Sequence, residues 1–426
     1  MEHKRTQLKN GVNFTLITDK KFKSDLTYIA FMTGKGGACA SLSSLLCGVL
    51  TCADAKYPSL FEMNRALDGL YDAQLNGRTL TSGFEHIPAF YVRTLNNRYA
   101  YDGTDIRGGA LGVLSGVIFD PLMKNGVLYP NSVENEKKQL SDGVKSIRND
   151  RGAYAERRCL TLMFENEPDF APRYGFGPDI EKITPLSLTE FYKDTLKNAA
   201  VEIVTVTGED ETAAYEYAQS VAERLGDRPA GVVRGTPAPF DGQIRFIDEE
   251  EPVNQGVLCV GCDTGASLQG KDSHIFALYD EILSRSPTSR LFKNVREKLS
   301  LCYYCGTAVF SGLRKMIIRA ELDNKNRKRA EEEIMNQLGL MKTELPEEEL
   351  LDAKRSLCSN YLSGTDSPSF TALWYLMRAL AGAEFISPVE YAEKIKSVKR
   401  ETVLEAAAKV RPDTVYFMKG AAADER

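Results

Sequence analysis

Histidine is nearly absent from this chain of 426 residues, which contains only His3, His86 and His274. A zinc site built on one helix needs two histidines three or four residues apart, so that both imidazoles project from the same face. No two histidines of this chain have that spacing. The sequence therefore excludes a metal site of this kind.

The chain also lacks an excess of positive charge and long apolar runs. Its net charge is −5 and its isoelectric point is near 5.6. Nucleic acids and anionic membrane surfaces attract clustered cationic charge, so neither is expected as a partner. No stretch is long enough to span a bilayer, and the polar start of the chain has no apolar core of a signal peptide behind it. We expect a cytoplasmic protein.

The nine cysteines do not form the pattern of a disulfide framework. They are odd in number and spread through predicted core segments, which is typical of a reducing compartment. Two pairs have Cys-x-x-Cys spacing, Cys259/Cys262 and Cys302/Cys305, which raises the possibility of a zinc site. Residues three apart on a regular strand point to opposite faces, and the gap between the pairs is far longer than in a zinc ribbon. We therefore interpret all four as small buried hydrophobic residues.

The length and the 43% hydrophobic content allow large cores in two or three domains. The sharpest change in composition is at 226–242, which is rich in glycine and proline and has no helical or strand periodicity. This predicts a first domain over 1–226, a linker over 227–241 and a second domain over 242–426.

The two halves repeat one pattern. In the first, a strand at 90–95 leads through two polar residues to a helix, and a second helix begins near Pro130. In the second, a strand at 317–322 leads in the same order to a helix and then to a helix near Pro346. Such a repeat indicates internal duplication. Strands followed by helices in each half predict an α+β fold with a mostly antiparallel sheet covered by helices.

The most specific motif lies at 286–304, where an amphipathic helix carrying Arg296 runs into a strand start carrying Tyr303. Taken alone, Arg296 could be a solvated helix residue and Tyr303 an ordinary strand aromatic. However, Ser-Arg-Leu-Phe, Arg-Glu-Lys and Leu-x-Tyr follow one another here in an order and spacing that closely resemble the second-domain signature of the pitrilysin/insulinase peptidases, the inverzincins.

This resemblance implies a fold of two similar α+β domains, each with a mostly antiparallel sheet of about six strands, as in one half of a mitochondrial processing peptidase-like clamshell. It also implies roles for the motif. Tyr303 would donate a hydrogen bond to the oxyanion of the tetrahedral intermediate, and Arg296 would add positive charge and orient the peptide.

Active members of that family carry a His-x-x-Glu-His helix in the first domain, followed by a Tyr-Pro-Ser turn that matches residues 57–59. Counting back from this turn places Ser44, Cys47 and Gly48 at the His, Glu and His positions. The third ligand position falls on Gly143, or on Asp142 with a one-residue slip. Serine and glycine cannot replace imidazole ligands, so the resemblance implies a degenerate zinc site.

In some bacterial members of the family, two chains form a heterodimer in which one supplies zinc and the catalytic base and the other the arginine and tyrosine. The overall pattern is most similar to such non-zinc subunits, in the group named for association with elongation factor P modification. The resemblance then implies a chain that is not an enzyme on its own and holds no cofactor. Zinc is expected in a His-x-x-Glu-His partner, and an extended peptide is expected as substrate, bound by pairing with a sheet edge.

Two alternatives remain. The chain could be a non-catalytic scaffold or peptide-binding protein derived from the same family, in which the Arg296/Tyr303 pair is a relic. It could also be a hydrolase that uses Cys47, because a thiolate beside a histidine is a good nucleophile. His86 is the histidine nearest a strand boundary, and we expect it at the surface.

Overall fold

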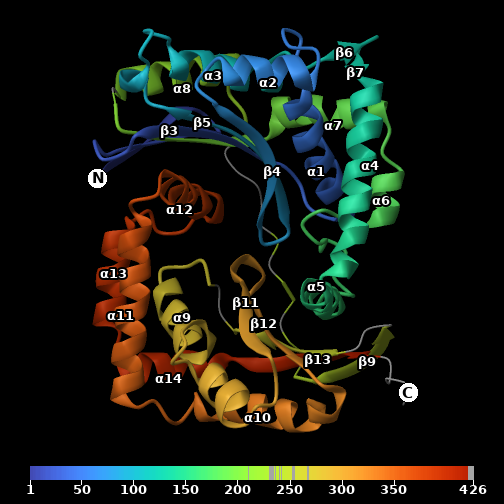
Figure 1. Ribbon diagram of the computed structural model, residues 1–426, viewed down its shortest axis with the longest axis vertical. Coiled ribbons are helices and arrows are strands. Elements are labelled where there is room, and N and C mark those ends of the chain that lie inside the picture. Colours follow the sequence, from blue (N-terminus) through green and yellow to red (C-terminus); the bar gives the residue numbers. More distant parts are fainter. Residues whose placement is uncertain are drawn as a thin grey trace. The chain divides into compact units, whose positions relative to one another are not determined.

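The computed structural model describes residues 1–209, 211–229, 235, 237–238, 240, 242–251, 255–265 and 268–420. They form two compact units, each assembled from several stretches of the chain (Figure 1). The described parts of the first unit fall within Met1–Lys145, Asp169–Gly235 and Gly364–Ala381, and the remainder of the described chain forms the second. Part of the predicted linker, 227–241, lies outside the described residues.

The first unit is built on a six-stranded sheet in the order β1-β2-β8-β3-β5-β4. All neighbours are antiparallel except β2 and β8, which are parallel. The strands are β1 (Glu2–Lys9), β2 (Val12–Thr18), β3 (Ser24–Met32), β4 (Gln74–Ser82), β5 (Glu85–Leu95) and β8 (Ala200–Thr207), with a separate hairpin of β6 (Met123–Lys124) and β7 (Val127–Leu128).

Helices from the first half of the sequence contribute to the apolar core of this unit. The core joins aliphatic side chains of the sheet to those of α1, α3, α7 and α8. The helices are α1 (Gly37–Cys52), α2 (Leu60–Asp68), α3 (Ile106–Phe119), α4 (Pro130–Ser146), α6 (Gly177–Glu181), α7 (Pro185–Asn198) and α8 (Glu211–Leu225).

The sheet of the second unit has five strands in the order β11-β12-β10-β13-β9. Only β13 and β9 are parallel. The order repeats that of the first sheet without β1, because β9, β13, β10, β12 and β11 take the places of β2, β8, β3, β5 and β4. The predicted α+β fold of two similar, mostly antiparallel sheets is therefore confirmed. The strands are β9 (Arg245–Glu251), β10 (Gly256–Asp263), β11 (Tyr304–Phe310), β12 (Lys315–Leu322) and β13 (Arg411–Gly420).

The remaining helices are α5 (Arg151–Met163), α9 (Ser273–Asp280), α10 (Arg327–Leu340), α11 (Glu347–Gly364), α12 (Pro368–Ala381), α13 (Pro388–Ser397) and α14 (Arg400–Lys409). Across the part of the chain that the structure describes, none of the helices has the length and apolar character needed to cross a membrane.

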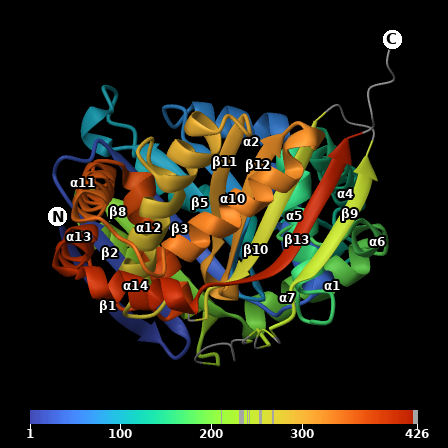
Figure 2. The same cartoon turned by 90° about the horizontal axis from the view of Figure 1, so that it is seen from below.

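Each sheet packs against one helix from the other half of the sequence. Helix α5 lies across β10, β12 and β13 (Figure 2), where a Cβ added to Gly261 would meet the Met163 Sδ at 2.5 Å. Helix α12 packs in the same way on β3 and β8 of the first unit, with Tyr375 and Leu376 fully buried. Neither sheet is covered only by its own half of the sequence.

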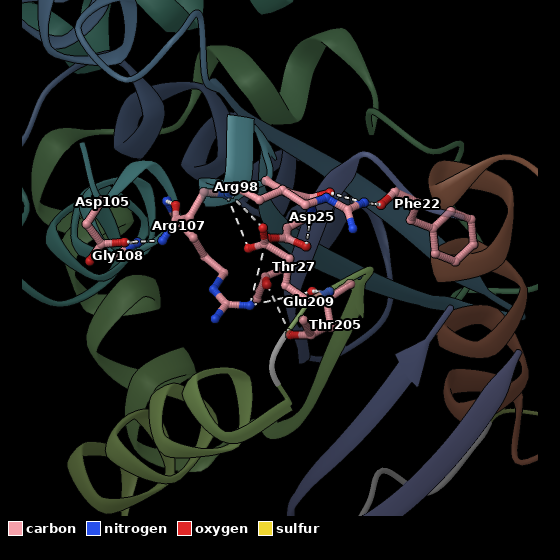
Figure 3. Close-up of polar contacts among 12 residues, drawn as sticks. Phe22, Asp25, Thr27, Arg98, Asp105, Arg107, Gly108, Thr205 and Glu209 are labelled. Atoms are coloured by element: carbon pink, nitrogen blue, oxygen red, sulfur yellow. Dashed lines mark hydrogen bonds and ion pairs between the residues drawn. The ribbon is translucent and has the colours of Figure 1, made fainter. Parts of the chain in front are cut away.

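A buried polar network fixes the turn that follows β5 to the sheet (Figure 3). Asp25 on β3 accepts a hydrogen bond from the Asn96 side chain at 2.8 Å, and its carboxylate lies 3.8 Å from the guanidinium of Arg107 on α3. Arg107 also donates to the Thr207 hydroxyl at 3.5 Å. Burial raises the pKa of Asp25, although Thr207 and Arg107 oppose this effect. The network therefore joins β3, β8 and the start of α3.

The packing of α12 on the first sheet can be tested with Leu376→Ala. Deletion of this buried side chain should lower the free energy of unfolding by about 2–5 kcal/mol, because it leaves a cavity between α12 and the sheet. Urea unfolding measures the change. Leu351→Ala, at an exposed position of α11, is the matched control and should cost less than about 0.5 kcal/mol. Equal, small losses in both variants would contradict this packing.

Candidate functional site

The three predicted zinc-helix positions lie on α1, which packs closely against β4 and β5. Gly77 on β4 allows this approach, because a Cβ there would lie only 2.6 Å from the Cys47 carbonyl oxygen. The fourth position, Gly143, lies on α4 at an exposed place where an added Cβ would meet open space.

Ser44 and Cys47 lie in surroundings that disfavour a metal cation. The Ser44 hydroxyl lies 2.9 Å from the Thr79 hydroxyl and donates to the Arg173 carbonyl oxygen at 3.2 Å. Burial raises the pKa of the Cys47 thiol to about 12, so it stays protonated at neutral pH and cannot act as a general base. The Arg173 side chain donates to the Thr79 carbonyl oxygen at 2.6 Å and adds positive charge near Cys47.

A carboxylate from α4 fills the space beside Gly48. A Cβ added to Gly48 would lie 2.6 Å from a carboxylate oxygen of Glu136, which also accepts a hydrogen bond from the Cys52 thiol at 3.1 Å. Among the described residues, no three or more histidine, cysteine, aspartate or glutamate side chains are grouped so that they could hold a metal ion. The residues present at this place therefore do not fit zinc.

We expect the purified chain to bind no zinc after incubation with excess zinc sulfate and removal of free metal, as measured by atomic absorption. The reason is the loss of both imidazoles and of the third carboxylate. The matched variant combines Ser44→His, Cys47→Glu, Gly48→His and Gly143→Glu, and should bind more zinc than the natural chain. One zinc ion per natural chain would contradict the degenerate site.

The prediction that His86 lies at the surface is wrong. His86 lies within β5, only 1% exposed, and neither ring nitrogen has a hydrogen-bond partner in the described part of the chain. It is the second residue of β5, opposite Thr81 of β4, and its backbone N–H donates to the Gly34 carbonyl at 3.1 Å. The Cys47 thiol makes its hydrogen bonds with the Ala89 backbone and Thr79. A Cys47 hydrolase therefore lacks the imidazole partner that it would need.

Burial lowers the pKa of His86 to about 4, from an ordinary value of 6.5. The unfolded chain binds more protons than the folded chain between these two pH values, so stability is complete above the unfolded pKa and falls as the pH drops toward the folded pKa. Between pH 7 and pH 4 this residue alone should remove about 3 kcal/mol from the free energy of unfolding.

Urea unfolding at the two pH values, on the natural chain and on His86→Phe, measures this contribution. The phenyl ring has a similar shape and cannot be protonated, so the variant should lose less stability on acidification. His274→Gln, at a partly exposed position, is the control and should retain most of the pH dependence of the natural chain. If His86→Phe loses as much free energy of unfolding on acidification as the natural chain, His86 is not the source of this pH dependence.

The second candidate site lies around Arg296 and Tyr303, both in the second unit. The predicted helix is present, with the segment Phe292–Lys298 in π-helical form, and β11 begins just after Tyr303. Val295 is buried, while Arg296 lies on the exposed side. The Leu301 N–H donates to the Val295 carbonyl at 3.0 Å, which joins the end of the helix to the start of the strand. Short π-helical turns occur frequently at functional sites.

Both side chains of this pair are accessible. The Arg296 side chain is 43% exposed, with its guanidinium 4.8 Å from the Phe292 ring centroid and 3.7 Å from the Glu297 carboxylate. Tyr303 is 58% exposed, and its hydroxyl donates a long hydrogen bond to the carboxylate of Asp323, at 3.4 Å. These contacts are loose enough to be exchanged for contacts with a bound group.

Tyr303 and Tyr304 lie where β11 begins. The Tyr303 N–H donates to the Glu321 carbonyl at 2.8 Å just before the strand, and Tyr304, the first residue of β11, is paired with Glu321. Both tyrosines are exposed, while Cys302 and Cys305 on either side are buried. The predicted burial of these cysteines is therefore confirmed, but the prediction that one regular strand carries both is wrong, because Cys302 precedes β11.

Comparison with known proteins gives matches over the whole chain. Residues 182–357, which include Arg296 and Tyr303, match a family model described as the peptidase M16 inactive domain. The chain is 24% identical over 412 residues to a Bacillus subtilis protein named probable inactive metalloprotease YmfF, with 96% of each chain covered. It is 21% identical over 305 residues to a Rickettsia felis protein named uncharacterized zinc protease, with 71% of each covered.

Solved structures show the same fold. A conserved protein from Enterococcus faecalis matches with a TM-score of 0.90 and 21% identity over 100% of both chains. A Pseudomonas fluorescens structure, described as a peptidase M16 inactive domain, matches with a TM-score of 0.81 and 18% identity, covering 100% of this chain and 99% of that one.

Proposed function

We propose that this chain, which is similar to an inactive metalloprotease homologue and carries a match to the peptidase M16 inactive domain, is the non-zinc subunit of a two-chain zinc peptidase of the pitrilysin/insulinase type. The observation that carries the proposal is a contrast between two sites. The ligand positions on α1 and α4 hold residues that do not fit zinc, whereas Arg296 and Tyr303 remain accessible in the second unit.

In this proposal the pair acts on the scissile carbonyl of a peptide. The Tyr303 hydroxyl exchanges its long hydrogen bond with Asp323 for a shorter one to the oxyanion, and the guanidinium of Arg296 adds positive charge. A donor of this kind, placed where negative charge develops, contributes about a hundred- to a thousandfold in rate. Zinc and the general base come from a partner chain that carries a His-x-x-Glu-His helix.

The sheet next to the pair suits an extended peptide. Strand β11 begins one residue after Tyr303 and forms an edge of the five-stranded sheet, with β12 as its neighbour. A peptide that pairs with such an edge is held through its main chain, so side chains of varied sequence can be accepted. The edge would place a peptide carbonyl beside the tyrosine.

The test uses this chain together with the His-x-x-Glu-His protein that copurifies with it, and measures peptide cleavage. Tyr303→Phe should lower kcat/KM about a hundred- to a thousandfold, and Arg296→Ala should also lower it, while light scattering shows normal assembly. Tyr304→Phe is the matched control, since it removes the hydroxyl of the next exposed tyrosine and should leave activity near that of the natural complex.

If the complexes with Tyr303→Phe and with Arg296→Ala both cleave peptide as fast as the natural complex, this pair does not act at the partner's zinc site. If the chain instead forms a stable homodimer and copurifies with no zinc peptidase, the alternative of a non-catalytic scaffold or peptide-binding protein is supported. Peptide binding to the homodimer, measured by fluorescence anisotropy, would then be the relevant readout.

A further inference from the structure

Strand β9 ends the second sheet on the side opposite β11. It takes the place that β2 holds in the first sheet, where β1 covers the outer side of β2 with antiparallel pairing from Glu2↔Thr18 to Lys9↔Val12. Strand β9 pairs with β13, and no strand in the described part of the chain lies on its outer side (Figure 2). The backbone N–H and C=O groups on that side are therefore open to pairing with a strand of another chain.

The open edge carries an exposed aromatic side chain. Phe246, the second residue of β9, is 60% exposed, and Ile244, just before the strand, is 41% exposed. Proteins that stay monomeric usually protect an edge strand with charged side chains, proline or a bulge at such positions. An edge with exposed apolar side chains is instead typical of a surface that pairs with another chain.

The rest of β9 is acidic, but each of its four consecutive carboxylates is paired with a cation of the same unit. The pairs are Asp248 with Arg327, Glu249 with Arg158 at 2.6 Å, Glu250 with Lys419 at 2.7 Å and Glu251 with Arg148 at 2.8 Å. This compensation leaves no excess of negative charge that would select a basic partner. The acidic run also disfavours a parallel, in-register partner of the same sequence, because like carboxylates would then lie side by side.

We propose that the outer edge of β9 pairs with β9 of a second copy of this chain, antiparallel, about a two-fold axis beside Phe246. The second sheets of both copies then form one continuous sheet. In this register the two Phe246 rings lie opposite each other at the axis. Residues 248–250 of one copy face residues 244–242 of the other, which are Ile244, Gln243 and Gly242 and carry no charge. The two acidic runs are thus kept at opposite ends of the interface.

Dimerisation through β9 is independent of the proposed function. Strand β11, the edge assigned to the peptide substrate, lies at the other end of the same sheet. Pairing through β9 therefore leaves Tyr303 and β11 free, and each copy can bind its own zinc-bearing partner. A two-fold interface uses the same patch on both copies, so assembly through this edge stops at two copies of the chain.

The mass of the natural chain alone, measured by light scattering and sedimentation at several concentrations, tests the pairing. We expect a dimer of the 47.3 kDa chain at micromolar concentration. Phe246→Glu places two like charges opposite each other at the axis and should weaken the dimer about thirtyfold or more, as for the loss of a hot-spot residue. Phe61→Glu, at a 74% exposed position of α2 in the first unit, is the matched control and should leave the dimer unchanged. Circular dichroism should show both variants folded like the natural chain.

A second variant tests the position of the axis. Phe246→Cys brings two new thiols together there, and a short bismaleimide should link two copies through them. The natural chain, in which Cys39 and Cys52 are partly exposed, and Phe61→Cys are treated in the same way and should give no link.

A monomer at every concentration, a species larger than a dimer, or a dimer that Phe246→Glu leaves intact would overturn the proposal. If the natural chain alone is monomeric and Phe246→Glu prevents copurification of the zinc-bearing partner, the edge binds that partner and not a second copy. Mass and cross-linking need no partner and no activity, so failure of the two-chain peptidase would appear as an inactive complex and would leave the dimer result readable.

Discussion

Each of the two sheets buries part of its apolar surface against a helix from the other half of the sequence, and the rest of the structure depends on this exchange. Helices α5 and α12 are separated in sequence from the strands that they cover, yet Tyr375 and Leu376 of α12 are as buried as the strands themselves. Fully burying one such side chain is worth about 1.5–3 kcal/mol. Neither half of the sequence can obtain that stabilisation alone.

The predicted zinc positions on α1 make few of the contacts that hold this helix on the sheet. On α1, the residues that face the core, including Leu45, Leu46 and Val49, are buried among aliphatic side chains. Ser44 lies on the more accessible side, and Gly48 lies against the carboxylate of Glu136. Substitution at the ligand positions therefore changes few of the contacts that hold α1 on the sheet.

The sequence predicts the duplication well, because the strand-to-helix order at 90–95 recurs at 317–322, and these segments lie in β5 and β12. It does not predict β1, whose residues Glu2–Lys9 are mostly polar and are held by pairing with β2. Nor does the sequence show which sheet α5 or α12 covers, since any apolar helical face can pack on any apolar sheet face.

The same limits apply to the sites. Counting along the chain places Ser44, Cys47 and Gly48 on one helix. It does not show that the Glu136 carboxylate lies beside Gly48 or that Arg173 adds positive charge near Cys47, because these residues come from distant segments of the chain. His86 is buried, and its backbone N–H donates to Gly34 in the segment before α1, a distant contact that no local pattern records.

The start of β11 decides which side chains are accessible at this edge of the second sheet. Tyr304 opens the strand and pairs with Glu321, whose carbonyl also accepts the Tyr303 N–H at 2.8 Å. Both tyrosines are exposed, while Cys302 and Cys305 on either side are buried. A regular strand would place one of two consecutive tyrosines inside. The accessible Tyr303 hydroxyl therefore depends on where the strand begins, and a substitution that extended regular pairing through Tyr303 would withdraw one of the two tyrosines from solvent.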